Sequence, residues 1–238
     1  MASDDPKDLS ERLRAIRAKR GYLLPHHGLM AVAAPDLLDA YDQTYTALTL
    51  TERVLSRHDH ESVWLAILSA TDEALATHHI PKYRDAGGSD AEFAQILSLT
   101  AFVLGFPAYR FIDRHWQPHL PGVNVTASYR EAFNAAAQGL DDRIAQLCAI
   151  AVHTCKAAWD GLEWQLCDAY ARQVPETEIA EALSLTMFPG SVPYFVEAAA
   201  IWRRLIVDDR VAASDAFRDW AQLSGQGGYD EASSGPSS

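Results

Sequence analysis

Apolar residues recur every three or four positions along most of this 238-residue chain, the spacing that places them on one face of an α-helix. The pattern predicts helices over 36–48, 61–75, 91–106, 143–152, 178–188 and 194–206. Alternation of single apolar and polar residues between hairpin dipeptides, which would indicate strands, does not occur. The sequence therefore predicts an all-α fold.

Short polar and glycine-rich segments mark the ends of these helices. In "DAGGSD" (85–90) a pair of glycines ends one helix, and Ser89 is placed to cap the next one. The segment "LPGVNVTASYRE" (120–131) is expected to connect two parts of the chain. The tail "SGQGGYDEASSGPSS" (224–238) has the composition of a linker and is expected to be disordered.

A sixteen-residue segment occurs twice in related form, as "EFAQILSLTAFVLGFP" (92–107) and "EIAEALSLTMFPGSVP" (178–193). The two copies lie 86 positions apart and share eight residues. Helical composition alone would not keep LSLT-x-F in register with a later proline. The sequence therefore predicts two related helical units, 35–118 and 124–208, which pack as one pseudo-symmetric domain after an N-terminal helix and lead-in at 1–34.

Each predicted unit has the same order of features: a helix that runs from polar to apolar, a break, a short helix, and a turn into E-[IF] at the start of another apolar helix. This order resembles the carboxymuconolactone decarboxylase and alkylhydroperoxidase-D-like superfamily, and "LRAIRAKRGYLLPHHGLMAVAAPDLLDAY" (13–41) is similar to its lead-in. The resemblance covers about residues 13–206. It implies the helical fold of that superfamily and a homo-oligomer, commonly threefold.

The resemblance also implies where the site residues lie. In the superfamily a histidine precedes the E-[IF] step, and a glutamate lies near the start of the helix before it. Thirteen residues before Glu92 stands His79, and the place of the glutamate falls on His60 or, with one residue deleted, on Glu61.

The same spacing in the second unit leads to a different pair. Counting back from Glu178 reaches Gln165, with Gln146 in the place of the glutamate. Two amides do not exchange protons at neutral pH, so the first unit is expected to carry the chemistry.

The peroxidase branch of the superfamily needs a Cys-x-x-Cys motif seven and four residues before the histidine. Those positions hold Asp72 and Leu75 in the first unit, and Ala158 and Gly161 in the second. No thiolate is therefore placed to attack a peroxide. The resemblance is to the cysteine-free decarboxylase branch, which implies that no metal or organic cofactor is used.

Decarboxylation of a β-keto-like or vinylogous acid needs hydrogen-bond donors for the developing enolate and a proton delivered to carbon. Histidine suits the second task because its ordinary pKa is about 6.5. We therefore assign His79 as general acid and Glu61 as its orienter or as a base. His78 and His60 are candidate contacts for a substrate carboxylate, and the expected apolar walls of the pocket are Trp64, Leu68 and Phe102.

Eighteen residues separate Glu61 from His79, which is about 27 Å along a straight helix. A shared site therefore requires the chain to turn back between them, or a neighbouring subunit to complete it. The segment "SATDEA" (69–74) is the predicted break, with Thr71 as the cap of a new helix.

Charge and composition narrow the classes of partner. The chain has 20 Lys and Arg residues against 32 Asp and Glu residues, a net charge of −12, and no block of basic residues. A nucleic acid or an anionic membrane is therefore not an expected partner. No apolar run approaches the roughly 20 residues that cross a bilayer, and the N-terminus lacks the apolar core of a signal peptide, so we expect a cytoplasmic protein.

Three hypotheses about function remain open. The first is a cofactor-independent lyase or isomerase that acts on a small carboxylated lactone or a related oxo-acid. The second is a non-catalytic ligand-binding or assembly protein, suggested by the Gln146/Gln165 pair and by Gln173 where a glycine is expected. The third is a metalloprotein that uses the histidines of "HDH" (58–60) and "HH" (78–79).

Overall fold

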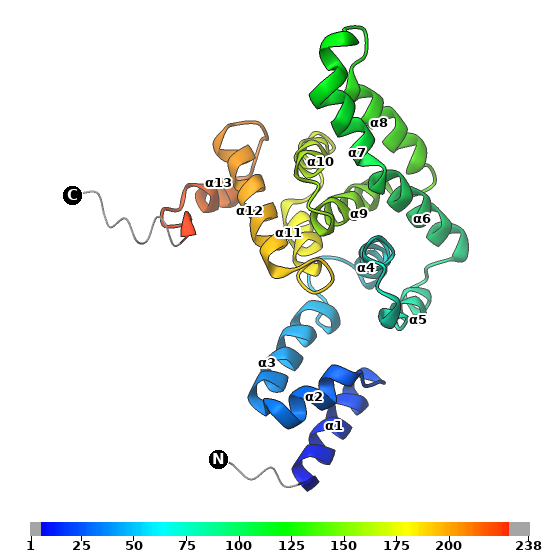
Figure 1. Cartoon of the computed structure of the whole chain (residues 1–238), viewed down its shortest axis with the longest axis vertical. Coiled ribbons are helices and arrows are strands. Elements are labelled where there is room, and N and C mark those ends of the chain that lie inside the picture. Colours follow the sequence, from blue (N-terminus) through cyan, green and yellow to red (C-terminus); the bar gives the residue numbers. More distant parts are fainter. Residues whose placement is uncertain (1–5, 229–238) are drawn as a thin grey trace, which may run out of the picture. The chain divides into compact units, whose positions relative to one another are not determined.

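The computed structural model describes residues 6–228, and these residues form helices and turns with no strand (Figure 1). The all-α prediction is confirmed. By its contacts the chain divides into two compact units, Met1–Glu52 and Arg53–Ser238. Residues 35–52, predicted to open the first repeat, belong to the first of these compact units. The part of the predicted disordered tail from residue 229 onward lies outside the described residues.

The first compact unit is a small bundle of α1 (Pro6–Arg20), α2 (Pro25–Ala33) and α3 (Pro35–Tyr45), followed by a π-helical turn, η1 (Thr46–Leu50). A proline begins α2 and α3, where its fixed φ suits a helix and its missing N–H costs nothing. The small apolar core of this unit consists of Ile16, Ala31 and Leu38.

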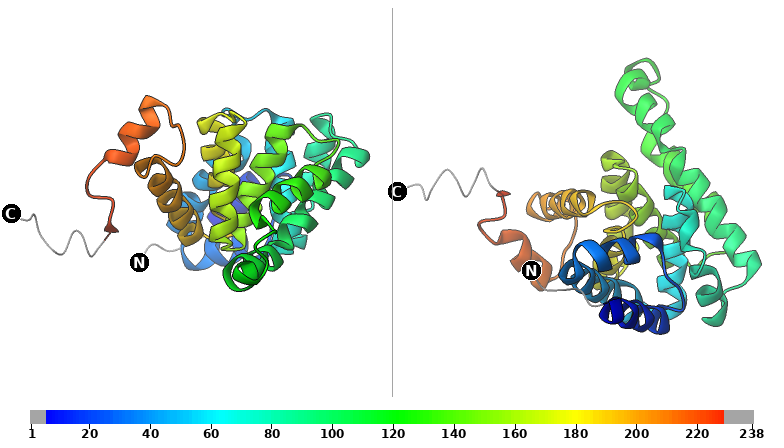
Figure 2. Two further views of the ribbon diagram at one scale, coloured as in Figure 1. Left: turned by 90° about the horizontal axis from the view of Figure 1, so that it is seen from above. Right: turned by 60° about the horizontal axis from the view of Figure 1, so that its bottom comes forward.

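The second compact unit holds the remaining helices, which Figure 2 shows from two further directions. They are α4 (Arg57–Thr71), η2 (Ala74–Ala76), α5 (His79–Asp85), α6 (Asp90–Leu104), α7 (Phe106–Phe111), η3 (Ile112–Trp116), η4 (Gln117–His119), α8 (Val125–Ala136), α9 (Asp142–Cys155), α10 (Trp159–Ala171), α11 (Glu176–Leu185), α12 (Val192–Val207) and α13 (Asp215–Gln222).

Helix α9 runs through the middle of this unit, with α4, α6, α10 and α11 packed around it (Figure 1). Every residue from Ile144 to Cys155 is buried, so α9 is enclosed by the protein on all sides. Helix α4 lies against it, and Cys148 Sγ is 3.7 Å from the carbonyl oxygen of Ser62. The core of the second unit is therefore built around the α4–α9 pair.

Residues with left-handed backbone follow helices in both the α4–α6 segment and the α9–α11 segment. Each first helix is followed by a residue with left-handed backbone, Asp72 (φ 58°) and Ala157 (φ 50°), 85 positions apart. Another left-handed residue follows α5 and α10, namely Gly87 (φ 97°) and Gln173 (φ 59°), 86 positions apart. A non-glycine residue with positive φ is uncommon, so three of these four turns are held by the packing around them.

Two predicted turns differ in detail. The break at 69–74 exists, but Thr71 ends α4 instead of capping a new helix, because its hydroxyl donates to the carbonyl of Ile67 inside the same helix. The predicted connector at 120–131 is shorter than expected. Asn124 accepts a hydrogen bond from the Ala127 N–H and so begins α8 within that segment.

One continuous helical run, Asp90–His119, is long and apolar enough to cross a membrane by length and composition alone. Its most apolar window has a mean hydropathy of 1.4, and 28% of that window is buried inside the protein. The sequence pattern did not reveal this run, because polar residues such as Gln95 and Ser98 interrupt it. Buried core helices of soluble proteins meet the same two criteria.

Candidate functional site

Glu61 lies in the first turns of α4, at a position that faces the protein interior. Ser56 begins this helix, because its hydroxyl accepts a hydrogen bond from the Asp59 N–H at 3.1 Å. The Glu61 side chain is 7% exposed and is therefore withdrawn from bulk water.

His79 reaches the same place because the chain reverses direction after α4. Asp72 adopts the left-handed backbone that ends α4, and the Glu73 carboxylate accepts a hydrogen bond from the Leu75 N–H in the following turn. Helix α5 then begins at His79, whose side chain is 2% exposed. Because the chain reverses, Glu61 and His79 are not held about 27 Å apart as they would be on a straight helix.

Glu61 and His79 form a short hydrogen bond, with 2.6 Å between Oε2 and Nδ1. An ionised carboxylate only accepts hydrogen bonds, so Nδ1 carries the proton and Nε2 is the basic nitrogen of the neutral ring. Among the described residues only Glu61 hydrogen-bonds to this ring. Nε2 is thus the ring nitrogen left to accept a proton.

The electrostatics of the pair favour a neutral imidazole beside an ionised carboxylate. Burial lowers the pKa of His79, and the Glu61 carboxylate raises it only in part, so this pKa lies below its ordinary value. Burial alone would raise the pKa of Glu61, but His60 and His79 outweigh that effect and lower it to about 2. At neutral pH the ring is thus a base whose charged form Glu61 would stabilise.

Three other predicted residues lie around this pair. The Trp64 ring stacks on the His79 ring with 4.7 Å between centroids, and its buried Nε1–H has no hydrogen-bond partner among the described residues. The His78 ring lies 4.4 Å from the His79 ring, and His60 Nδ1 is 3.7 Å from the Glu61 carboxylate. An unpaired buried donor is costly, so the Trp64 N–H is a natural contact for a substrate oxygen.

Lys82 also belongs to this cluster, although the sequence analysis did not single it out. Its positive charge lowers the pKa of both Glu61 and His79. The available signal was its spacing, since Lys82 follows His79 by three residues on the same helix and therefore lies on the same face.

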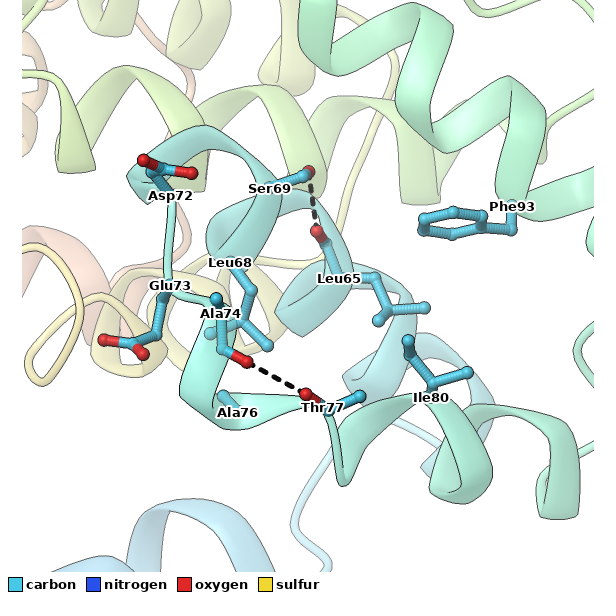
Figure 3. A pocket seen from close by; sticks show the side chains of 10 residues that line it. All are labelled: Leu65, Leu68, Ser69, Asp72, Glu73, Ala74, Ala76, Thr77, Ile80 and Phe93. Carbon is cyan, nitrogen blue, oxygen red and sulfur yellow. Dashed lines mark hydrogen bonds between the residues drawn. The ribbon is translucent and has the colours of Figure 1, made fainter. Parts of the chain in front are cut away.

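A pocket of about 270 Å³ lies between α4, α5 and α6 (Figure 3). Leu65, Ile80 and Phe93 point toward one another from these three helices, and Leu68 contributes to the wall of this pocket. The full lining is Leu65, Leu68, Ser69, Asp72, Glu73, Ala74, Ala76, Thr77, Ile80 and Phe93. Glu61 and His79 are not among these residues, but Leu65 and Leu68 follow Glu61 on one face of α4, and Ile80 adjoins His79.

Phe102 lies in a different cluster from the one predicted. Its ring neighbours are Tyr109, Tyr129 and Phe133, at 5.2–6.4 Å between centroids. Within the described part of the chain, the structure gives no ring or hydrogen-bond contact between Phe102 and Glu61 or His79. The α-helical spacing that placed Phe102 in the core did not show which neighbour it faces.

The α9–α11 segment holds a neutral hydrogen-bond network where the α4–α6 segment holds the Glu61–His79 pair. The Gln165 side chain donates to the Gln146 side chain and accepts from the Tyr129 hydroxyl at 3.0 Å. His153 Nε2 lies 2.9 Å from the same hydroxyl. Burial lowers the pKa of His153 to about 3, so this network carries no charge at neutral pH.

The other two residues of "HDH", His58 and Asp59, are engaged in side-chain contacts. His58 Nε2 is 2.9 Å from the Glu92 carboxylate, and Asp59 pairs with Arg143 at 2.7 Å. Within residues 6–228 no three His, Cys, Asp or Glu side chains gather in a way that could hold a metal ion.

Comparisons of the chain with models of known protein families, with curated proteins and with solved structures gave no match. The chemistry of the site is therefore inferred from its own residues. Of the predicted site residues, the structure brings together Glu61, His79, His78, His60 and Trp64, places Leu68 at the neighbouring pocket, and places Phe102 elsewhere.

The lowered pKa of Glu61 predicts a defined dependence of stability on pH. Its folded pKa of about 2 lies below the unfolded value of 4.5, so its contribution is complete above pH 4.5 and is lost as the pH falls toward 2. We expect Glu61→Gln to cost about 2 kcal/mol at pH 7, and this cost to shrink below pH 4.5. Denaturant unfolding of both proteins across this range measures the difference; a cost that stays constant would contradict an ionised, stabilised Glu61.

Proposed function

We propose that this protein is a cofactor-independent proton-transfer enzyme, a lyase or isomerase similar to carboxymuconolactone decarboxylase, that acts on a small carboxylated lactone or oxo-acid. The supporting observation is the 2.6 Å hydrogen bond between Glu61 and His79, two buried residues 18 positions apart in the sequence. The structure contains an acid–base pair that only the reversal of the chain brings together.

The neutral state of His79 determines the order of steps that we propose. Nε2 first accepts a proton from the carbon next to the substrate carbonyl, which leaves an enolate and a charged imidazolium. Glu61 stabilises the imidazolium, and the Trp64 N–H is a donor for the enolate oxygen. Return of the proton to a conjugated carbon completes an isomerisation. His79 thus acts first as a base, whereas the sequence analysis assigned it as a general acid.

Decarboxylation uses the same groups with a different proton balance. Loss of CO2 from the substrate carboxylate leaves the electron pair in an enolate. The proton that replaces CO2 at carbon comes from the His79 imidazolium, which solvent has protonated beforehand. The charge of Lys82 and the neighbouring His60 and His78 suit a substrate that carries a carboxylate.

We further propose that the α4–α6 and α9–α11 segments are two copies of one helical unit, arranged as in the alkylhydroperoxidase-D-like fold. The shared LSLT-x-F motif and the two pairs of left-handed turns support this. The Gln146–Gln165 hydrogen bond lies 85 and 86 positions after the Glu61–His79 bond and links corresponding helices. The second copy keeps the geometry and lacks the proton-exchanging groups.

The test is a screen of carboxylated lactones and β-oxo acids for CO2 release and for exchange of substrate protons with D2O. We expect His79→Gln to lower turnover of a converted compound at least about 100-fold, because it removes the base. The α9–α11 segment already accommodates an amide at the corresponding place, so this variant is expected to fold with unchanged helicity. The exposed His119→Gln is the matched control and is expected to keep parental turnover.

A ligand-binding protein without catalysis is the second candidate. The observation that favours it is the burial of the pair, since neither Glu61 nor His79 lines the neighbouring pocket. A compound from the same screen that binds and is recovered unaltered would support it. Undiminished turnover in His79→Gln would instead show that another group performs the proton transfer.

A further inference from the structure

Six apolar side chains of α6 and α7 form an exposed line on the surface of the second compact unit. They are Ala94, Leu97, Ala101, Leu104, Ala108 and Phe111, which we call the 94–111 stripe. The spacing alternates between three and four residues, as in the seam of a coiled coil. The large members are 48% (Leu97), 38% (Leu104) and 45% (Phe111) exposed.

The opposite side of the same helices is already used for packing. Ile96, Leu99 and Val103 are buried against the core, and α6 lies against α4, α8 and α9. From Phe93 to Tyr109 the sequence holds no charged residue, and exposed Ser98 is a polar neighbour of the stripe. A continuous exposed apolar patch of this kind marks an interaction surface.

The alternation of small and large side chains makes the stripe complementary to a second, antiparallel copy of itself. If two copies of the stripe lie antiparallel, Ala94 faces Phe111, Leu97 faces Ala108 and Ala101 faces Leu104, and the same pairs recur in reverse order. Every layer then combines one alanine with one large residue, so the separation of the helices is uniform. A parallel pair would stack alanine on alanine and large on large, which leaves gaps that cost packing energy.

The charges at the two ends of the stripe are also complementary in the antiparallel arrangement. Asp90 at the start of α6 pairs with Arg84 and has an 85% exposed side chain, and Arg114 beyond the end of α7 pairs with Asp160 and has a 57% exposed side chain. Antiparallel pairing brings Asp90 of one copy next to Arg114 of the other, and a parallel pair would place like charges together. The opposed helix dipoles add to this preference.

We propose that two copies of this chain associate antiparallel through the 94–111 stripe, about a two-fold axis between Ala101 and Leu104. The contact is isologous, since each copy presents the same surface to the other. It is independent of the proposed chemistry, and it assigns a surface and a two-fold symmetry in place of the threefold assembly that the family resemblance implies.

Light scattering of the full chain over a concentration series tests the assembly. We expect the mass of two chains for the parent. In Leu97→Glu/Leu104→Glu we expect association at least about 100-fold weaker and therefore the mass of one chain. The matched control is Val196→Glu/Val207→Glu on α12, where the side chains are 59% and 52% exposed. Helicity measured by circular dichroism checks that each variant is folded.

Cross-linking tests the orientation. We expect a mixture of Ala94→Cys and Phe111→Cys chains to form a disulfide-linked dimer, and Ala94→Cys alone to give only the parental background from the native cysteines. Efficient linking of Ala94→Cys alone would overturn the antiparallel arrangement. The proposal is also overturned by a parental mass of one or three chains, by unchanged association of the glutamate variant, or by flotation of the parent with phosphatidylcholine vesicles.

Discussion

Replacing Gly161 by alanine is expected to destabilise the second compact unit by about 3 kcal/mol. A Cβ at this position would lie 2.4 Å from Cε1 and 2.5 Å from Nδ1 of His153. The His153 ring is 1% exposed, so it has no free space into which it could move. The clash must therefore be relieved by breaking contacts of the ring.

Two contacts hold this ring in place. His153 Nε2 is 2.9 Å from the Tyr129 hydroxyl, and the ring meets Phe106 edge-on at 5.0 Å between centroids. Displacing the ring breaks a buried hydrogen bond and disturbs close packing, and these costs exceed the gain of about 1 kcal/mol that alanine normally brings to a helix interior.

Denaturant unfolding of Gly161→Ala and the parent measures this effect. Gly122→Ala is the matched control, because the space around the Gly122 Cβ position is open and the expected change is within about 0.5 kcal/mol. A Gly161→Ala protein as stable as the control would show that the His153 ring is not fixed by its neighbours.

The fold was predictable from sequence to the extent that local signals define it. Helical periodicity identified the long helices, and the Ser89 cap begins α6 as expected, with its hydroxyl accepting from the Glu92 N–H. Thr71 was misread because threonine is favoured at N-caps, yet its hydroxyl is satisfied within α4. Single-residue preferences therefore located the breaks but not the role of each residue in them.

The site was predictable only where spacing carried the information. The resemblance in spacing selected Glu61 and His79, and their 2.6 Å contact depends on a left-handed turn at Asp72, a conformation that aspartate tolerates better than most residues. Phe102 was predicted at the site and lies elsewhere, whereas Lys82 lies at the site and was not predicted. Periodicity marks a residue as inward-facing, but the choice of partner is made by the packing of helices distant in sequence.

Exchanging the amide pair for an acid–base pair is expected to produce strong coupling between two positions. Gln146 is fully buried, and in Gln146→Glu the new carboxylate would face the uncharged Gln165 side chain. A buried uncompensated charge is costly, and we expect this single substitution to destabilise the chain by about 3 kcal/mol at pH 7. The penalty should fall in acid, because the folded state raises the pKa of such a carboxyl and favours its protonated form.

The double variant Gln146→Glu/Gln165→His should recover most of that loss. A histidine at position 165 would have Nδ1–H for the carboxylate and Nε2 for the Tyr129 hydroxyl, which now donates to Gln165. We expect a coupling energy of at least about 2 kcal/mol in a double-mutant cycle measured by denaturant unfolding. The exposed Gln138→Glu controls for the added charge alone.

The double-mutant cycle tests whether positions 146 and 165 have the same geometry as positions 61 and 79, although their residues differ. If the costs of the two single substitutions simply add, positions 146 and 165 do not reproduce the arrangement of Glu61 and His79, and the proposed duplication of the helical unit loses its structural support. If they couple, the α9–α11 segment can hold an acid–base pair that its present residues do not supply. The two segments would then differ at these positions in their side chains and not in their backbone.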